Sequence, residues 1–210
     1  TVKATAFWEG KAVGSGEYRA CSSSVEIPVA LSERHLWEVG AGRLYDLELT
    51  VEKDGKTLDL AQSYFGLRTV CLDGRAFKIN GKSVFGRWVL DQGFYPDGIY
   101  TAPTDEALKN DILYSMQLGF NGARLHEKIF EPRFLYWADK LGYIVWGEHA
   151  NWGLNITDMG QIQYFLPEWL EALDRDMCHP SIIGWCPFNE TWDFEGRQQS
   201  DELIRLCISC

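Results

Sequence analysis

The stretch SIIGWCPFNE, residues 181–190, decides how the second part of the chain is interpreted. It follows Pro180, continues as a short apolar run, and ends with Asn189 beside Glu190. A continuous apolar run of this length is typical of a buried parallel strand. The carboxyl ends of such strands carry the chemistry of an α/β barrel, so Glu190 is a candidate catalytic residue. The simpler alternative is that Asn189 caps a turn and Glu190 is a solvated loop residue.

Three earlier segments repeat this pattern of a strand followed by a polar residue. Strands are expected near residues 84–90, 120–125 and 143–147. Helices are expected to begin at Thr104, Pro132 and Pro167, and a last one near Arg197. Strands that alternate with helices predict a parallel sheet. No glycine-rich phosphate loop follows any of them, which favours a barrel over a nucleotide-binding open sheet.

The first 80 residues follow the pattern of antiparallel β-structure. Alternating apolar residues predict strands at residues 2–6, 25–29 and 44–51. Asp54-Gly55 and Asn80-Gly81 are hairpin turn signals. Short strands with regular turn signals predict a β-sandwich.

The composition and the net charge indicate a globular protein and argue against some classes of binding partner. Apolar residues make up 46% of the chain and charged residues 24%, which is typical of a globular protein with a core. The net charge of -10 argues against nucleic acid and anionic membrane surfaces as partners. No apolar run approaches the ~20 residues that span a bilayer.

The six cysteines show neither a zinc-site spacing nor an obvious disulfide framework. Only Cys207 and Cys210 form a CxxC pair. With no recognisable signal peptide, these thiols favour a cytoplasmic location. No metal ligand cluster is visible, and no cofactor is expected.

Four blocks of residues together resemble the family 2 glycoside hydrolases, which include β-galactosidase and β-glucuronidase. The blocks are HLW at 35–37 with LYDL at 44–47, FGLR at 65–68 with FKINGK at 77–82, LGFNGAR at 118–124, and HPSIIGW at 179–185 with Asn189-Glu190. The last block is the most specific of the four. The resemblance extends from about His35 to Phe194.

The resemblance implies a retaining β-glycosidase. In it, Glu190 corresponds to the acid/base residue and Asn189 to the amide that binds the sugar 2-hydroxyl. The family's nucleophile lies at the end of the seventh barrel strand, and no residue of this chain is nominated for that role. The expected substrate is a β-linked carbohydrate. A non-catalytic carbohydrate-binding or scaffold module with the same fold is the alternative.

The expected architecture is an immunoglobulin-like β-sandwich at residues 1–80 followed by the first half of a TIM (β/α)8 barrel at residues 81–210. Four strand–helix units are half of such a barrel. We therefore expect a truncated fragment that is inactive alone. Self-association is a further hypothesis, because half a barrel leaves open sheet edges and uncovered apolar surface.

The expected site combines polar residues at the strand ends with nearby aromatic residues. Glu190 is the predicted catalytic residue. The predicted substrate-binding residues are Asn189, Arg124, His126, Glu148, Asp91, Trp152 and Trp192. Each has a structural alternative: the charged residues could brace one another, and the tryptophans could belong to the core or the rim.

Overall fold

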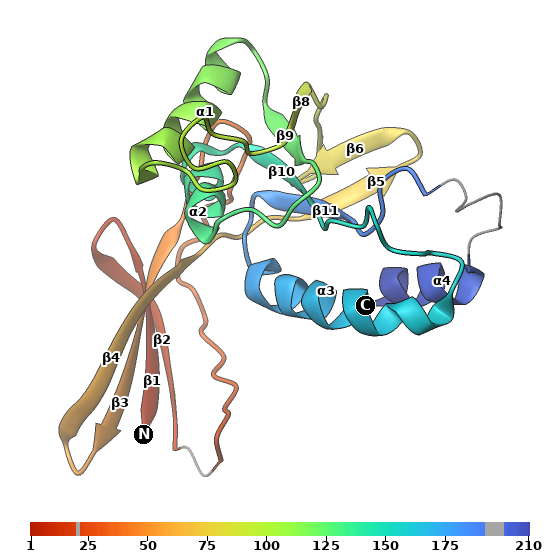
Figure 1. Ribbon diagram of the computed structural model, residues 1–210. Helices are drawn as coiled ribbons and strands as arrows, with labels where there is room; N and C mark the ends of the chain where they lie inside the picture. Colours follow the sequence, from red (N-terminus) through yellow and green to blue (C-terminus); the bar gives the residue numbers. More distant parts are fainter. Residues whose placement is uncertain (20–21, 192–199) are drawn as a thin grey trace. The chain divides into compact units, whose positions relative to one another are not determined.

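The computed structural model describes residues 1–19, 22–191 and 200–210, and it divides into two compact units, Thr1–Ser83 and Val84–Cys210. The ribbon is shown in Figure 1. The strands of the first unit are β1 (Val2–Trp8), β2 (Lys11–Tyr18), β3 (Tyr45–Lys53), β4 (Lys56–Phe65), β5 (Val70–Asp73), β6 (Ala76–Ile79) and β7 (Lys82–Ser83).

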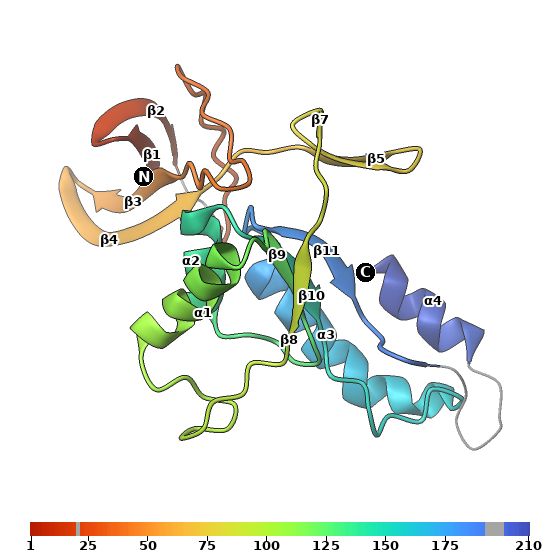
Figure 2. The same cartoon turned by 90° about the horizontal axis from the view of Figure 1, so that it is seen from above.

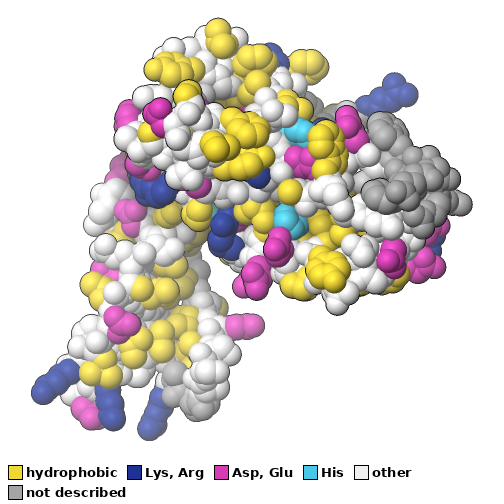
Figure 3. Space-filling model, viewed as in Figure 1, with side chains coloured by type: hydrophobic (Ala, Val, Ile, Leu, Met, Phe, Trp, Pro, Cys, Tyr) yellow, Lys and Arg dark blue, Asp and Glu magenta, His cyan; other side chains and the backbone are white. Residues whose placement is uncertain are grey.

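The first unit contains two antiparallel sheets, with strand orders β2-β1-β3-β4 and β5-β6-β7. The expected turns at Asp54-Gly55 and Asn80-Gly81 join β3 to β4 and β6 to β7. Ala6, Val13 and Tyr45 form the buried centre of this unit. Figure 3 shows hydrophobic side chains reaching its surface, and Leu58 on β4 is 63% exposed.

The prediction of a strand at residues 25–29 is wrong. This segment lies alongside β2, so closely that a Cβ added at Gly16 would lie 2.4 Å from the Pro28 carbonyl oxygen. It nevertheless has no strand assignment. Pro28 has no N–H to donate to a ladder, which explains why the apolar alternation here does not produce a paired strand.

The second unit is built on a parallel sheet with the order β11-β10-β9-β8, whose strands lie side by side in Figure 2. The strands are β8 (Trp88–Asp91), β9 (Gly122–Leu125), β10 (Ile144–Glu148) and β11 (Ile182–Cys186). The helices are α1 (Asp105–Gln117), α2 (Pro132–Leu141), the 3-10 turn η1 (Met159–Gln161), α3 (Ile162–Asp176) and α4 (Asp201–Ser209). No helix in the described ranges is both long and apolar enough to cross a membrane.

Local signals explain the ends of two helices. Thr104 caps α1 by accepting a hydrogen bond from the Ala107 backbone N–H at 3.1 Å, as expected for this residue type. Pro132 occupies the first turn of α2, and Gly142 ends that helix with a φ of 71°, a conformation that glycine adopts without strain.

The prediction that α3 begins at Pro167 is wrong, because the helix begins at Ile162 and contains this proline. An internal proline removes one helical hydrogen bond and costs about 3 kcal/mol. Phe165 and Trp169 flank it and are buried against Leu203 and Cys207 of α4, so packing offsets that cost. The last helix begins at Asp201 rather than near Arg197, which lies outside the described residues.

The sheet separates two kinds of surface. One face carries Ala123, Leu125, Val145 and Ile182, which form the core with Leu108 and Ile112 of α1 and with Phe134, Leu135 and Ala138 of α2. Side chains alternate between the faces of a strand, so the residues between these, Arg124 and Trp146 among them, lie on the other face.

Each of the neighbouring strands β10 and β11 carries one tryptophan and one glycine, and each tryptophan is paired with the glycine of the other strand. Trp146 is paired with Gly184, and Gly147 is paired with Trp185. A Cβ on Gly184 would lie 2.5 Å from the Trp146 ring, and one on Gly147 would lie 2.5 Å from the Trp185 ring. Each indole therefore occupies the space left by the glycine of the neighbouring strand, one on each face of the sheet.

Candidate functional site

The polar cluster lies on the sheet face opposite the helix core and is centred on Glu148. This residue ends β10, and its side chain is 0% exposed. Arg124 on β9 donates to it twice, from Nε to Oε2 at 2.5 Å and from Nη2 to Oε1 at 3.1 Å. The Nδ1 atom of His126 lies 2.8 Å from Glu148 Oε1. A buried carboxylate is thus compensated by a bidentate guanidinium and an imidazole.

Arg124 connects this cluster to the end of β11. Its Nη2 atom also donates to Asn189 Oδ1 at 2.5 Å. The hydrogen bonds with Glu148 raise the pKa of the Arg124 guanidinium, so it is always charged. With Oδ1 engaged by Arg124, the Nδ2 donors of Asn189 are the atoms through which this amide can bind a hydroxyl oxygen.

Glu190 lines a cavity of about 390 Å³ together with Arg124 and Asn189. Its lining combines the charged and amide groups of the site with aromatic rings and one thiol: Trp88, Arg124, Trp146, Cys186, Phe188, Asn189 and Glu190. Glu190 is exposed and has a φ of 50°, in the left-handed region. Burial, with a contribution from Glu148, raises the pKa of the Cys186 thiol, which disfavours a reactive thiolate there.

Trp152 lies beside the cluster. Its ring is edge-on to His126, with centroids 6.0 Å apart, and the residue is 65% exposed. The Glu127 carboxylate fixes its backbone by accepting the Trp152 N–H at 3.1 Å. An exposed indole held in one position offers an apolar face on which a sugar ring could stack.

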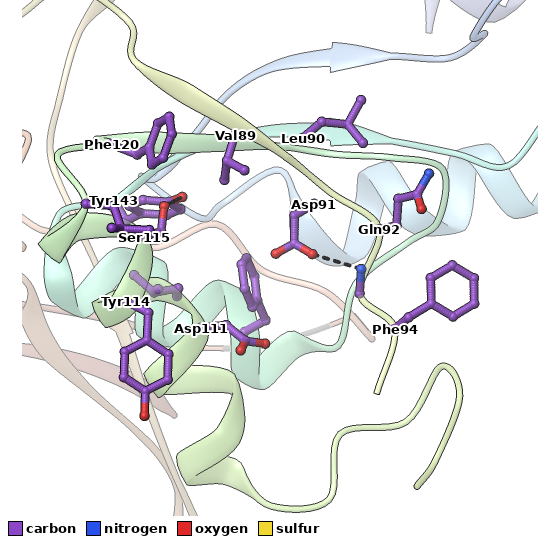
Figure 4. Close-up of a pocket in the computed structure, with 14 residues that line it drawn as sticks. Val89, Leu90, Asp91, Gln92, Phe94, Asp111, Tyr114, Ser115, Phe120 and Tyr143 are labelled. Carbon is purple, nitrogen blue, oxygen red and sulfur yellow. Dashed lines mark hydrogen bonds between the residues drawn. The ribbon is translucent and has the colours of Figure 1, made fainter. Parts of the chain in front are cut away.

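Asp91 does not join the cluster. It lines a separate cavity of about 460 Å³ between β8 and α1, and Figure 4 shows its carboxylate pointing toward Asp111. Its register partner is Leu125, whose side chain is in the helix-side core, whereas Arg124 is paired with Leu90. The expectation that all strand-end polar residues share one site fails here, because adjacent positions on β8 face opposite sides.

Burial raises the pKa of Asp91, and the nearby Asp111 contributes in the same direction. Its Oδ1 atom accepts a hydrogen bond from the Gly93 N–H at 2.8 Å, which partly opposes that shift. Asp91 therefore lines the cavity on the helix side of the sheet, apart from the cluster around Glu148.

Trp192, the remaining candidate, lies outside the described residues.

Within the described ranges, no group of three or more His, Cys, Asp or Glu side chains is arranged to hold a metal ion. Cys71, Cys178, Cys186, Cys207 and Cys210 are free thiols in the structure.

The sequence interpretation missed several residues of this region. Trp88 and Trp146 line the cavity, with ring centroids 5.7 Å apart. The position of Trp146 two residues before the predicted Glu148 was a usable signal, because residues i and i+2 share a strand face. Trp88 had no such signal, because the predicted residue on its strand was Asp91, which faces the other side. Asn151 and Glu127 were also missed, and both make hydrogen bonds in the loops that surround the site.

Comparison with known proteins agrees with the resemblance found in the sequence. Residues 5–68 match the sequence model of the family described as Glycosyl hydrolases family 2. The chain is 26% identical over 185 residues to the β-galactosidase BoGH2A of Bacteroides ovatus, covering 83% of this chain and 21% of that protein. The chain is related to the family 2 glycosyl hydrolases.

Other relatives extend this relationship. A putative β-glucuronidase of Formosa agariphila is 26% identical over 181 residues, covering 80% of the chain and 21% of that protein. A solved β-glucuronidase from Ruminococcus gnavus, in complex with C6-substituted uronic isofagomine, superposes with a TM-score of 0.85 at 19% identity. That match covers 99% of this chain and 35% of the other, and at this identity it shows a shared fold.

Proposed function

We propose that this chain supplies the acid/base half of the active site of a retaining β-glycosidase, with Glu190 as the acid/base residue. The observation that carries the proposal is the shared cavity of Glu190, Asn189 and Arg124 at the carboxyl ends of parallel strands. The carboxyl ends of barrel strands are where α/β barrels place their catalytic groups. The relatives named β-galactosidase and β-glucuronidase support a β-linked sugar as substrate.

In the architecture we propose, residues 1–80 form an immunoglobulin-like sandwich and residues 81–210 the first half of a TIM barrel. The strand order β8-β9-β10-β11 is that of four consecutive barrel strands, and the structural likeness to the Ruminococcus gnavus enzyme supports this arrangement. The chain spans about a fifth of the Bacteroides ovatus protein's length, so the activity proposed is that of a complete protein that includes these residues.

In the first step, Glu190 gives a proton to the leaving glycosidic oxygen while a second carboxylate attacks the anomeric carbon. Two such carboxyl groups lie about 5–5.5 Å apart in retaining enzymes. We nominate no residue among 1–210 for the nucleophile and assign it to the complementary barrel strands. In the second step, Glu190 takes a proton from the water that releases the sugar.

The other residues of the cluster bind and orient. Asn189 donates from Nδ2 to a sugar hydroxyl, and Arg124 fixes that amide through Oδ1. Glu148 holds Arg124 and His126 in place. Trp152 offers an exposed face for stacking at the edge of the site. No cofactor takes part in these steps.

The test compares the complete protein with its Glu190→Gln variant on aryl β-galactosides and β-glucuronides. With poor leaving groups, kcat/KM should fall by about 10²–10⁴-fold, the usual contribution of general acid catalysis. With activated leaving groups the loss should be smaller, and added azide should restore turnover, because it attacks the glycosyl-enzyme without needing a general base. Equal rates for both proteins would overturn the proposal.

A matched control is Glu171→Gln, an exposed carboxylate on α3, which should leave both rates unchanged. Sugar binding without turnover by the complete protein would favour the non-catalytic carbohydrate-binding module instead. Residues 1–210 alone should show no appreciable turnover, because the proposal assigns the nucleophile to strands outside these residues. Self-association of residues 1–210 through the edge strands β8 and β11 is also proposed, and a monodisperse monomer in solution would contradict it.

A further inference from the structure

Asn151 makes two hydrogen bonds to the backbone of Asn189, the residue before Glu190. Its Oδ1 atom accepts the Asn189 N–H at 2.7 Å, and its Nδ2 atom donates to the Asn189 carbonyl oxygen at 3.1 Å. Both residues are buried, with exposures of 5% and 6%. A side-chain amide therefore satisfies both polar backbone groups of Asn189 at once.

This pair of bonds extends the contact between two loops beyond the end of the sheet. The last register pair of β10 and β11 is Glu148 with Cys186. Beyond that point no strand pairing fixes residues 187–190, although Glu190 must be held to act on a substrate. The Asn151 amide supplies one donor and one acceptor there, as a backbone peptide group in a ladder would.

Asn151 is itself fixed by the loop that follows β9. The Glu127 Oε1 atom accepts the backbone N–H of Asn151 at 3.0 Å and that of Trp152 at 3.1 Å. Hydrogen bonds thus connect the loops after β9, β10 and β11 in sequence. The connection ends at Asn189, whose side chain is also held by Arg124.

We propose that Asn151 is a positioning residue for the acid/base carboxylate, acting through the Asn189 backbone; this inference rests on the proposed function. Asparagine suits the position because only an amide offers both a donor and an acceptor at this length. Ionised aspartate would place a second oxygen against the Asn189 carbonyl, and alanine would leave two buried backbone groups unsatisfied. Glu127 supports the same geometry one step further from the substrate.

The test measures the complete protein and its variants Asn151→Ala and Asn151→Asp on aryl β-glycosides. With poor leaving groups, Asn151→Ala should lower kcat by about 10–100-fold, because small misplacements of a catalytic group have effects of this size. The loss should shrink with activated leaving groups, which need no protonation. A uniform loss across leaving groups, or a change in KM alone, would overturn the proposal.

Asn151→Asp provides a second readout through pH. When protonated, the aspartic acid can again donate to the Asn189 carbonyl and accept its N–H. A buried carboxyl beside a carbonyl oxygen titrates above the usual value of about 3.9, so the ratio of variant to wild-type kcat should rise from pH ~7 toward pH ~5. A constant ratio would contradict the proposal. This comparison decides the question even if the alanine variant does not fold.

Asn155→Ala is the matched control. Asn155 lies in the same loop, and its Oδ1 atom accepts hydrogen bonds from the Thr157 N–H and Oγ1. It should leave the leaving-group and pH dependence of turnover unchanged. The Glu190→Gln variant distinguishes the two proposals. If it turns over substrate as fast as the wild type, the proposed function fails. If it loses activity as expected while the Asn151 variants do not, only the positioning role of Asn151 is overturned.

Discussion

Two carboxylates, Glu148 and Asp91, end strands of the same sheet and meet opposite conditions. Glu148, at the end of β10, is fully buried and receives hydrogen bonds from Arg124 on the face that carries the candidate site. Asp91, at the end of β8, faces α1, and burial raises its pKa. Its Oδ1 atom accepts a hydrogen bond from the Gly93 N–H.

The difference shows that position along a strand is not enough to assign a polar residue to a site. Both carboxylates occupy strand ends, and both looked equivalent in the sequence. Side-chain alternation places Glu148 beside the Arg124 guanidinium and the His126 ring, and it places Asp91 on the side of the sheet that faces the helices. Four substitutions test this difference between the two faces of the sheet.

The largest effect is expected from Glu148→Ala. Arg124 and His126 would lose their shared partner, and removing one member of a buried ion pair costs about 3–5 kcal/mol. Denaturant unfolding measures the loss. Glu168→Ala is the control, because the Glu168 side chain is 70% exposed and burial lowers the pKa of its partner His149, so that this pair should contribute no more than about 1 kcal/mol. Equal losses for both variants would contradict the importance of the buried cluster.

Leu125→Ala tests the helix side of the sheet. Leu125 is 2% exposed and belongs to the core formed with α1 and α2. Truncating a buried leucine costs about 2–5 kcal/mol, which thermal or denaturant unfolding should detect. Leu118→Ala, at a residue 78% exposed, should change stability by about 0.5 kcal/mol or less. A small loss at Leu125 would mean that this face is not the core.

Gly184→Ala probes the close contact on the site face. The new methyl group would lie 2.5 Å from the Trp146 ring, so the indole or the strand must move. Overpacking of this kind costs about 1–3 kcal/mol in unfolding experiments. At Gly160, the nearest atom to an added Cβ is Asp158 Oδ1 at 3.1 Å, and Gly160→Ala should be better tolerated. Equal tolerance would show that the Trp146 ring is loosely held.

Asp91→Asn should have the smallest effect and the opposite sign. Burial raises the folded-state pKa of Asp91 above its unfolded value, so stability is greatest when the group is protonated and falls as pH rises through the folded-state pKa. At pH ~7, asparagine should raise Tm by about 2–4 °C, the shift that about 1 kcal/mol produces at this size.

That advantage should disappear at low pH, where Asp91 is protonated in both folded and unfolded protein. Calorimetry at neutral and acid pH measures the difference between the two proteins. A variant that is less stable at neutral pH would show that Asp91 has a compensating partner.

Much of the second unit could be predicted from sequence because its signals are local. Thr104, Pro132 and Gly142 mark helix ends through rules that concern a few neighbouring residues. The apolar run after Pro180 predicted β11, and the structure confirms a strand at Ile182–Cys186. Pro167 misled the interpretation, because tertiary burial of its neighbours outweighs the local preference against proline.

The site was harder to predict because its contacts join residues far apart in the chain. Arg124 and Asn189 are 65 positions apart, and no local pattern couples them. Asn151 contacts the Asn189 backbone, whose position depends on the path of a loop. Asp91 could have been separated by counting alternate positions along β8, if its register with β9 had been known.

The exchanged Trp146-Gly147 and Gly184-Trp185 pairs have a consequence for how β10 and β11 find each other. Sliding one strand by a single residue in one direction would set the Trp146 ring against the Trp185 ring, which would clash. Sliding it in the other direction would set Gly147 against Gly184 and leave a hole. The two dipeptides therefore specify a single register between β10 and β11. They ensure that Glu148 and Cys186 end at the same level of the sheet each time the protein folds.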